Sequence, residues 1–285
     1  MRKMLDNRVE REVLSLIEGV AYASVPAWYG SVRRNLKMDL IVPKNRAGHA
    51  PMPLIIWICG GAFRCVSRSA WLPELMGFAR RGYCVASIEY RTVNEGAYAD
   101  SYADVKSAIR YLKAHAAEYC IDTGRIAVMG ESAGGTMASF AGVAGHIREF
   151  DRGDYLEYDS SVHAVVDFYG IVDCTCNPIQ ADGRDIPPFM MEDFLGLDYS
   201  REDALRASPI AYINADTPPF LIFHGNRDNR VPFEQSVRLY EALRAAGVSA
   251  DFYELDGADH GEDSFYQPEK LEIVDRFLRE VLHIG

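Results

Sequence analysis

Short, continuous apolar runs recur along this chain and constrain its fold more than any other feature. They are LIIWI at 54–58, YCVASI at 83–88, RIAVM at 125–129, VHAVVDFY at 162–169 and PFLIFH at 219–224. Runs without polar alternation are typical of strands buried on both faces. Helical patterns separate or follow them, at roughly 71–81, 98–118, 133–146, 233–246 and 268–282. This alternation predicts an α/β fold whose mostly parallel central sheet carries helices on both faces.

Other segments refine this prediction. The N-terminal stretch from Val9 to Val20 has apolar residues near helical spacing and reads as an amphipathic segment, whereas residues 36–42 alternate and predict a half-buried antiparallel strand. YEL at 253–255 supplies a final strand. Helix C-caps are expected at Gly82, Gly124 and Gly247.

We expect one domain over residues 1–285, since α/β folds of this length often share a single core. No repeat, linker or low-complexity tract divides the chain. The irregular stretch 170–215 is rich in Pro, Asp and Gly, and its length predicts a lid or cap insertion.

Charge and composition restrict the classes of binding partner that we expect. A formal net charge of -11 makes nucleic acid an unfavourable partner, and no segment has the length and apolarity of a membrane span. Acidic residues interrupt the N-terminal apolar positions, so no signal peptide is predicted and a cytoplasmic location is expected. A homo-oligomer is compatible with the sequence, which leaves the oligomeric state open.

Six cysteines are expected to be free thiols, because nothing indicates secretion. Cys174 and Cys176 lack a second ligand pair at zinc spacing, so loop cysteines are the preferred interpretation and no metal is implied.

The strongest chemical signal is Gly130-Glu131-Ser132-Ala133-Gly134, a G-x-S-x-G between an apolar strand and a helical run. That context is the one a nucleophile elbow requires, because flanking glycines let a serine occupy a tight strand-to-helix turn. The alternative is a glycine-rich turn that merely contains a serine. Glu131 reads as a polar support near the elbow rather than a second acid.

A serine nucleophile needs a histidine base and an acid that orients it. His260 follows the last predicted strand in a polar loop, and Asp228 follows the preceding strand. Asp256 and Asp259 are too close to His260 in sequence to be first choice, and His224, at a strand end, is expected to pack or bond locally. The chain order Ser132, Asp228, His260 is the order expected for an α/β-hydrolase.

The turn Cys59-Gly60-Gly61-Ala62-Phe63 follows another apolar run, and its small residues let backbone N–H groups approach an oxyanion. We predict donors at Gly61, Ala62 and Ala133. A plain strand-end turn is the alternative.

Together, CGGAF, GESAGG, SPI at 208–210, PPFLIFHGNRDNRVPFEQS and DHG resemble bacterial α/β-hydrolase esterases of the hormone-sensitive-lipase type and related acetyl and feruloyl esterases. The resemblance spans about residues 30–283 and implies hydrolysis of small carboxylic esters without metal or cofactor. The family's H-G-G-G motif begins with histidine where this chain has Cys59, and it ends with glycine where this chain has Ala62. The loss of the histidine puts the loop's hydrogen-bonded support in question.

The sequence constrains the substrate pocket and the substrate class less closely than the triad. An apolar acyl or alcohol pocket is predicted from aromatic and methionine side chains, with lid packing as the alternative role: Phe63, Trp71, Phe189, Met190, Met191, Phe194, Phe265 and Tyr266. Short acyl esters and acylated plant-derived oligosaccharides fit equally well. A serine exopeptidase and a non-catalytic ligand-binding homologue are the alternative functions.

Overall fold

A twisted sheet of eight strands forms the centre of the molecule over the residues that the structure describes. The computed structural model describes residues 1–285 except 2, 47 and 177–188, and only the backbone of 189 and 190. The strands are β1 (Leu14–Ala27), β2 (Val32–Pro43), β3 (Met52–Ile58), β4 (Cys84–Ile88), β5 (Ile121–Glu131), β6 (Ala164–Phe168), β7 (Phe220–Gly225) and β8 (Ala250–Leu255). Their order in the sheet is β1-β2-β4-β3-β5-β6-β7-β8. The β1–β2 and β2–β4 pairs are antiparallel, and every other pair of neighbouring strands is parallel. The predicted mostly parallel sheet is confirmed.

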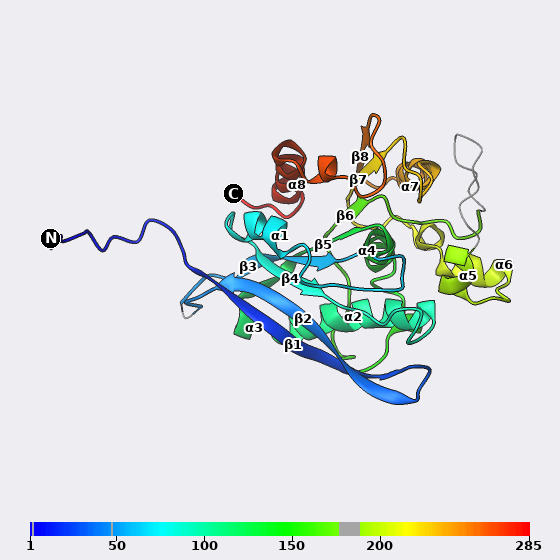
Figure 1. The fold of residues 1–285 in the computed structure, drawn as a ribbon, viewed down its shortest axis with the longest axis horizontal. Coiled ribbons are helices and arrows are strands. Elements are labelled where there is room, and N and C mark those ends of the chain that lie inside the picture. Colours follow the sequence, from blue (N-terminus) through cyan, green and yellow to red (C-terminus); the bar gives the residue numbers. More distant parts are fainter. Residues whose placement is uncertain (2, 47, 177–188) are drawn as a thin grey trace.

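Helices cover both faces of this sheet, and each face has its own apolar core (Figure 1). One core includes residues of α2 (Tyr98–Ala114), α4 (Ala133–Val143) and α7 (Glu234–Ala245). The opposite core includes α1 (Leu72–Ala79) and α8 (Pro268–Val281). The central strands contribute side chains to both cores, which explains their continuous apolar sequences.

Between β6 and β7 lie two short helices, α5 (Phe189–Leu195) and α6 (Arg201–Ala207), within the segment predicted as a lid. Ser200 caps α6, because its hydroxyl accepts the Asp203 N–H while the Asp203 carboxylate accepts the Ser200 N–H. The remainder of that segment includes residues outside the described part of the chain. Short 3-10 turns over Arg148–Phe150, Pro209–Tyr212 and Asp263–Tyr266 complete the elements described.

The N-terminal segment does not form a helix. Residues 14–27 are the strand β1, paired with β2 in an antiparallel ribbon, and Gly19 has a positive φ of 67° at a register shift between Ile17 and Val20. Such a bulge moves the apolar residues out of strict alternation and produces the helix-like spacing. Pairing with β2, a non-local contact, therefore determines that this segment is a strand.

Two predicted helix boundaries also change. The stretch 98–118 contains two helices, because α2 ends at Ala114 and α3 (Ala116–Tyr119) follows. Gly124 is not a helix cap: it lies inside β5, and Cys120 takes the left-handed conformation after α3 with a φ of 64°. Gly82 and Gly247 have positive φ after α1 and α7.

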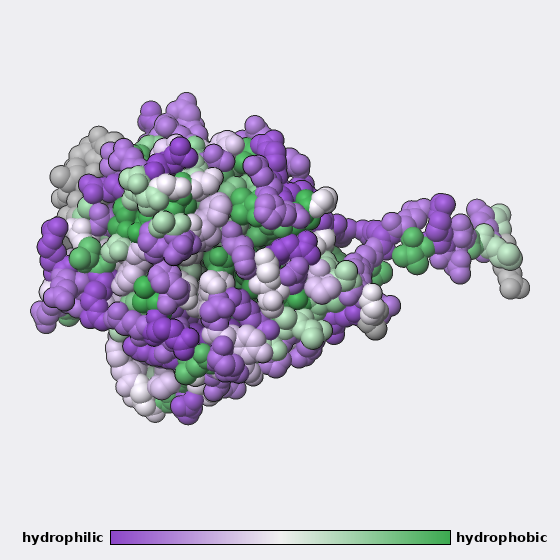
Figure 2. Space-filling model, turned by 180° about the vertical axis from the view of Figure 1, so that it is seen from behind, coloured by the Kyte–Doolittle hydropathy of each residue, from purple (hydrophilic) through white to green (hydrophobic). Residues whose placement is uncertain are grey.

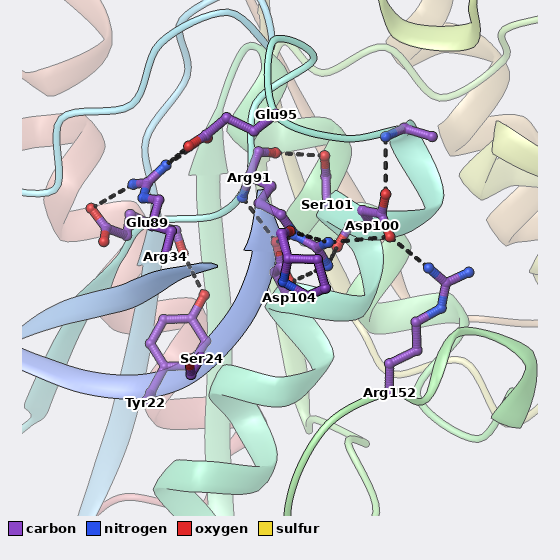
Figure 3. A network of polar contacts seen from close by, with 12 residues as sticks. Tyr22, Ser24, Arg34, Glu89, Arg91, Glu95, Asp100, Ser101, Asp104 and Arg152 are labelled. Atoms are coloured by element: carbon purple, nitrogen blue, oxygen red, sulfur yellow. Dashed lines mark hydrogen bonds and ion pairs between the residues drawn. The ribbon is translucent and has the colours of Figure 1, made fainter. Parts of the chain in front are cut away.

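A polar network fastens the β1–β2 ribbon to the loop that follows β4 (Figure 3). Arg34 of β2 contacts Glu89 and Glu95, and Arg91 forms two 2.8 Å contacts to the buried Asp104 of α2. The loop in turn holds the segment after β3, since the Val93 N–H donates to the Phe63 carbonyl. The network therefore connects the β1–β2 ribbon, through this loop, to the segment that follows β3.

Residues 3–12 project from the body and are exposed (Figure 2). Within the described residues, no helix combines the length and apolarity needed to cross a bilayer.

Candidate active site

Ser132 stands at the turn between β5 and α4 in a strained backbone conformation. Its φ and ψ are 55° and -122°, a region that non-glycine residues rarely occupy. The turn is tight because the chain crosses itself closely: a Cβ at Gly134 would lie 2.0 Å from the Ile58 carbonyl oxygen, and one at Gly130 would lie 2.2 Å from the Gly134 oxygen. The two glycines therefore permit the elbow, as the motif predicts.

His260 joins Ser132 to Asp228. Its Nε2 lies 2.9 Å from the Ser132 Oγ, and its Nδ1 lies 2.7 Å from Asp228 Oδ2. An ionised carboxylate only accepts, so Nδ1 carries the proton and Nε2 is left to accept from the serine hydroxyl. The structure thus brings together the three side chains singled out as nucleophile, base and acid.

Asp228 is held as a carboxylate by several donors. Its Oδ1 accepts the N–H groups of Arg230 and Val231, both at 2.8 Å. Burial acts to raise its pKa, but the hydrogen bonds from His224 and His260 outweigh burial and hold the pKa below its usual range. The lowered pKa keeps Asp228 an ionised acceptor for the two histidines.

Two further residues fix this geometry, and sequence reasoning gave neither a role in the site. The buried His224 lies on the other side of the acid, with Nε2 3.2 Å from Asp228 Oδ2 and Nδ1 2.7 Å from the Ser236 Oγ. Asp259 accepts the N–H of His260 at 2.7 Å and that of Asn229 at 2.9 Å, and so bridges the histidine loop and the acid loop. For His224, the available sequence signal was its position four residues before Asp228.

The backbone N–H groups predicted as oxyanion donors lie in the loop after β3 and at the start of α4. Gly61, Ala62 and Phe63 have consecutive positive φ values of 138°, 53° and 61°. A Cβ at Gly61 would lie 2.2 Å from the Cys65 carbonyl oxygen, so only glycine fits there. Within the described residues, no acceptor takes the N–H of Gly61, Ala62 or Ala133, and the last of these opens α4.

Glu131 of the elbow supports this loop, in which Cys59 stands where the family motif has its histidine. Its Oε1 accepts the Gly60 N–H at 2.6 Å and lies 3.7 Å from the Cys59 Sγ. Burial raises the pKa of Glu131, opposed by the Gly60 N–H and the charge of His260. Burial and the Glu131 carboxylate raise the pKa of the Cys59 thiol to about 11, so Cys59 is a neutral donor. The expectation that Glu131 supports the elbow region agrees with these contacts.

A cavity of about 430 Å³ opens over Ser132. Its walls are residues 61–65, the elbow 131–133, Ile171, Arg230, Val231 and His260. Cavities of roughly 300–1,000 Å³ are typical of small-molecule sites.

The aromatic residues predicted to line this cavity have different positions. Phe63 lines it and stacks on Phe194 at 4.0 Å, so Phe194 forms a second layer. Trp71 packs on Tyr266 at 4.1 Å, and Phe265 packs on Tyr169 at 4.6 Å, in the core over α1 and α8. The residues that line the cavity do not include Trp71, Phe194, Phe265, Tyr266 or the buried Met191, because these side chains pack in the two apolar cores. The side chains of Phe189 and Met190 lie outside the described part.

The described residues contain no cluster of metal-binding side chains. Over the described residues, no group of three or more His, Cys, Asp or Glu side chains could hold a metal ion, and all six cysteines are free thiols.

Comparison with known proteins gives the family. The model of the BD-FAE family matches residues 38–243. A probable isoprenylcysteine alpha-carbonyl methylesterase, ICMEL1 of Arabidopsis thaliana, is 31% identical over 90% of this chain and 54% of that protein. The probable carboxylic ester hydrolase LipM of Mycobacterium tuberculosis is 32% identical over 89% of this chain and 60% of that protein. The chain thus spans little more than half the length of these curated relatives.

A solved structure is also similar. A truncated form of a carbohydrate esterase from gut microbiota superposes with a TM-score of 0.81 at 28% identity, covering 96% of this chain and 99% of that one. With the sheet order, the elbow and the family match taken together, this chain has the α/β-hydrolase fold and belongs to the BD-FAE family.

Proposed function

We propose that this chain is a serine carboxylesterase that hydrolyses small esters with short acyl chains. The observation that carries the proposal is the pair of contacts made by His260, 2.9 Å to the Ser132 Oγ and 2.7 Å to Asp228 Oδ2, at the floor of a cavity. Support comes from the family match and from relatives named as ester hydrolases.

The proposed mechanism uses only groups of this chain. His260 Nε2 takes the Ser132 proton as the Oγ attacks the ester carbonyl carbon, and the N–H groups of Gly61, Ala62 and Ala133 hold the oxyanion. His260 then protonates the leaving alcohol, and water repeats the sequence on the acyl-enzyme. The Asp228 carboxylate stabilises the imidazolium formed in each half-reaction.

Hydrolysis of p-nitrophenyl esters from acetate to octanoate tests this function, with wild type and Ser132→Ala compared directly. We expect activity that peaks at short chains and is lost in the variant. An organophosphonate probe should label Ser132, as located by peptide mass spectrometry. Near-wild-type hydrolysis by pure Ser132→Ala would overturn the assignment.

Acylated oligosaccharides are a second candidate substrate, favoured by the similarity to a carbohydrate esterase. Acetate release from acetylated xylo-oligosaccharides should then exceed release from simple aryl acetates. Equal or slower release removes this candidate. A serine exopeptidase would instead cleave aminoacyl or dipeptidyl amides, which we expect to be inert, and a non-catalytic homologue would hydrolyse nothing.

The organisation of the protein is proposed with the same function. The proposal includes a single α/β-hydrolase domain over residues 1–285, with 170–215 as a lid or cap insertion. It places the protein in the cytoplasm, acting on small-molecule esters without nucleic acid, membrane or cofactor. A monomer and a homo-oligomer are both compatible with it. Sedimentation of the purified chain tests the oligomer, and cell fractionation tests the location.

A further inference from the structure

The cavity over Ser132 carries positive charge on two of its walls. Apart from His260, the charged residues of its lining are Arg64, Glu131 and Arg230. Glu131 is engaged by the Gly60 N–H, as described above. Arg64 is engaged by Asp193 of α5. Arg230 differs from both: its side chain is exposed, and no carboxylate of the described residues pairs with its guanidinium.

The position of Arg230 is fixed by the catalytic group itself. Its backbone N–H donates to Asp228 Oδ1 at 2.8 Å, and Val231 makes the matching contact at 2.8 Å. The guanidinium therefore starts from a backbone that is anchored to the acid of the triad, on the wall of the cavity next to Val231. The anchored backbone fixes where the Arg230 side chain leaves the cavity wall, within reach of a ligand bound at Ser132.

The charge of the chain as a whole makes this cation informative. With a formal net charge of -11, the surface on average repels anions. Arg230 lines the reaction cavity, and a guanidinium turned toward a ligand there would reverse that field locally. Its planar pair of N–H donors matches a carboxylate.

We propose that Arg230 is a specificity-determining residue that binds a carboxylate on the substrate, so that this chain prefers esters of acids or alcohols that carry a second, ionised carboxyl group. The inference rests on the proposed esterase function. The carboxylate belongs either to the acyl part or to the alcohol part of the ester, and the two sources are separable by experiment.

Two matched substrate pairs test the proposal. For the acyl side, monoethyl glutarate is compared with ethyl 4-carbamoylbutanoate, in which a neutral amide replaces the carboxylate. For the alcohol side, 4-acetoxybutanoate is compared with 4-acetoxybutanamide. Released acid is titrated at constant pH with wild type, Arg230→Gln and Arg227→Gln. Arg227 is an exposed arginine of the same loop that does not line the cavity, so its variant controls for loss of one positive charge.

For wild type we expect kcat/KM for the carboxylate member of one pair to exceed that of its amide by about tenfold, equivalent to about 1.4 kcal/mol. The pair that shows the preference identifies the acyl or the alcohol side. The difference should lie in KM, because a remote ion pair is made equally in ground state and transition state. It should also shrink as salt is added.

Arg230→Gln should reduce the carboxylate-to-amide ratio of kcat/KM to about one, whereas Arg227→Gln should retain the wild-type ratio. No preference in wild type, or a preference that survives Arg230→Gln, overturns the proposal while leaving the esterase function intact. Failure to hydrolyse any of these esters or p-nitrophenyl acetate, in wild type, would instead overturn the proposed function and this inference with it.

Discussion

Glu131→Ala gives the sharpest test of how the oxyanion loop is held. The substitution removes the carboxylate that accepts the Gly60 N–H at 2.6 Å, and this N–H immediately precedes the proposed donors. A hydrogen bond to a charged group contributes about 1.5–3 kcal/mol, which corresponds to roughly 10- to 150-fold in rate if the loop depends on it in the transition state. The loss should appear in kcat and in kcat/KM for p-nitrophenyl acetate, with KM unchanged.

Glu131→Gln provides the graded control, because it keeps an acceptor oxygen and loses the charge. We expect a smaller loss, within about tenfold, since a neutral hydrogen bond contributes about 0.5–1.5 kcal/mol. A Glu131→Ala enzyme with wild-type kcat would show that the loop holds itself and would refute the argument.

Although Glu131→Gln should lower the rate, we expect it to keep or raise the thermal stability at alkaline pH. The pKa of Glu131 is raised in the folded chain, chiefly by burial, so the stability that this group contributes is complete below its unfolded pKa and is lost as pH rises through its folded pKa. At alkaline pH the neutral glutamine avoids the cost of burying charge. The thermal midpoint of the variant should therefore equal or exceed that of wild type at alkaline pH, and a marked decrease would contradict this reasoning.

Three further substitutions test other parts of the structure. Asp228→Asn replaces a carboxylate oxygen by an NH2 donor, so the His260 proton is no longer fixed on Nδ1, and kcat should fall by roughly 10³- to 10⁴-fold in steady-state assays; a loss below tenfold would remove Asp228 from the triad. Gly134→Ala would place a Cβ 2.0 Å from the Ile58 carbonyl oxygen, so thermal denaturation should show a large loss of stability, and an unchanged midpoint would refute the close crossing. The pKa of the fully buried Asp167 is raised from 3.8 to about 6, mainly by burial, so its stabilising contribution declines as pH rises through about 6. Urea midpoints of Asp167→Asn should lack this decline, and parallel curves for variant and wild type would contradict it.

Local sequence predicted much of the sheet because its strands are buried on both faces. The runs at 54–58 and 219–224 needed no neighbour to be recognised, since any exposed register would leave apolar residues in water. The N-terminal strand lacked this property. Its bulge at Gly19 gave it helix-like spacing, and only pairing with β2 specified it.

The positions of Ser132, Asp228 and His260 could be predicted for a similar reason. Each follows a strand, and the carboxyl ends of parallel strands meet at one edge of the sheet. Their order along the chain therefore indicated a shared site before any distance was known.

Contacts between loops could not be read in this way. Sequence gave no reason to place His224 against Asp228 or Asp259 between the loops of Asn229 and His260, and it did not separate Phe63, which lines the cavity, from Phe265, which packs in the core. Periodicity reports which face of an element is buried, but not which partner covers it. The sequence by itself determined the α/β class, the elbow and the order of the candidate triad; the tertiary structure decided the support of the oxyanion loop by Glu131 and the cation at Arg230, because both depend on segments that meet only when the chain is folded.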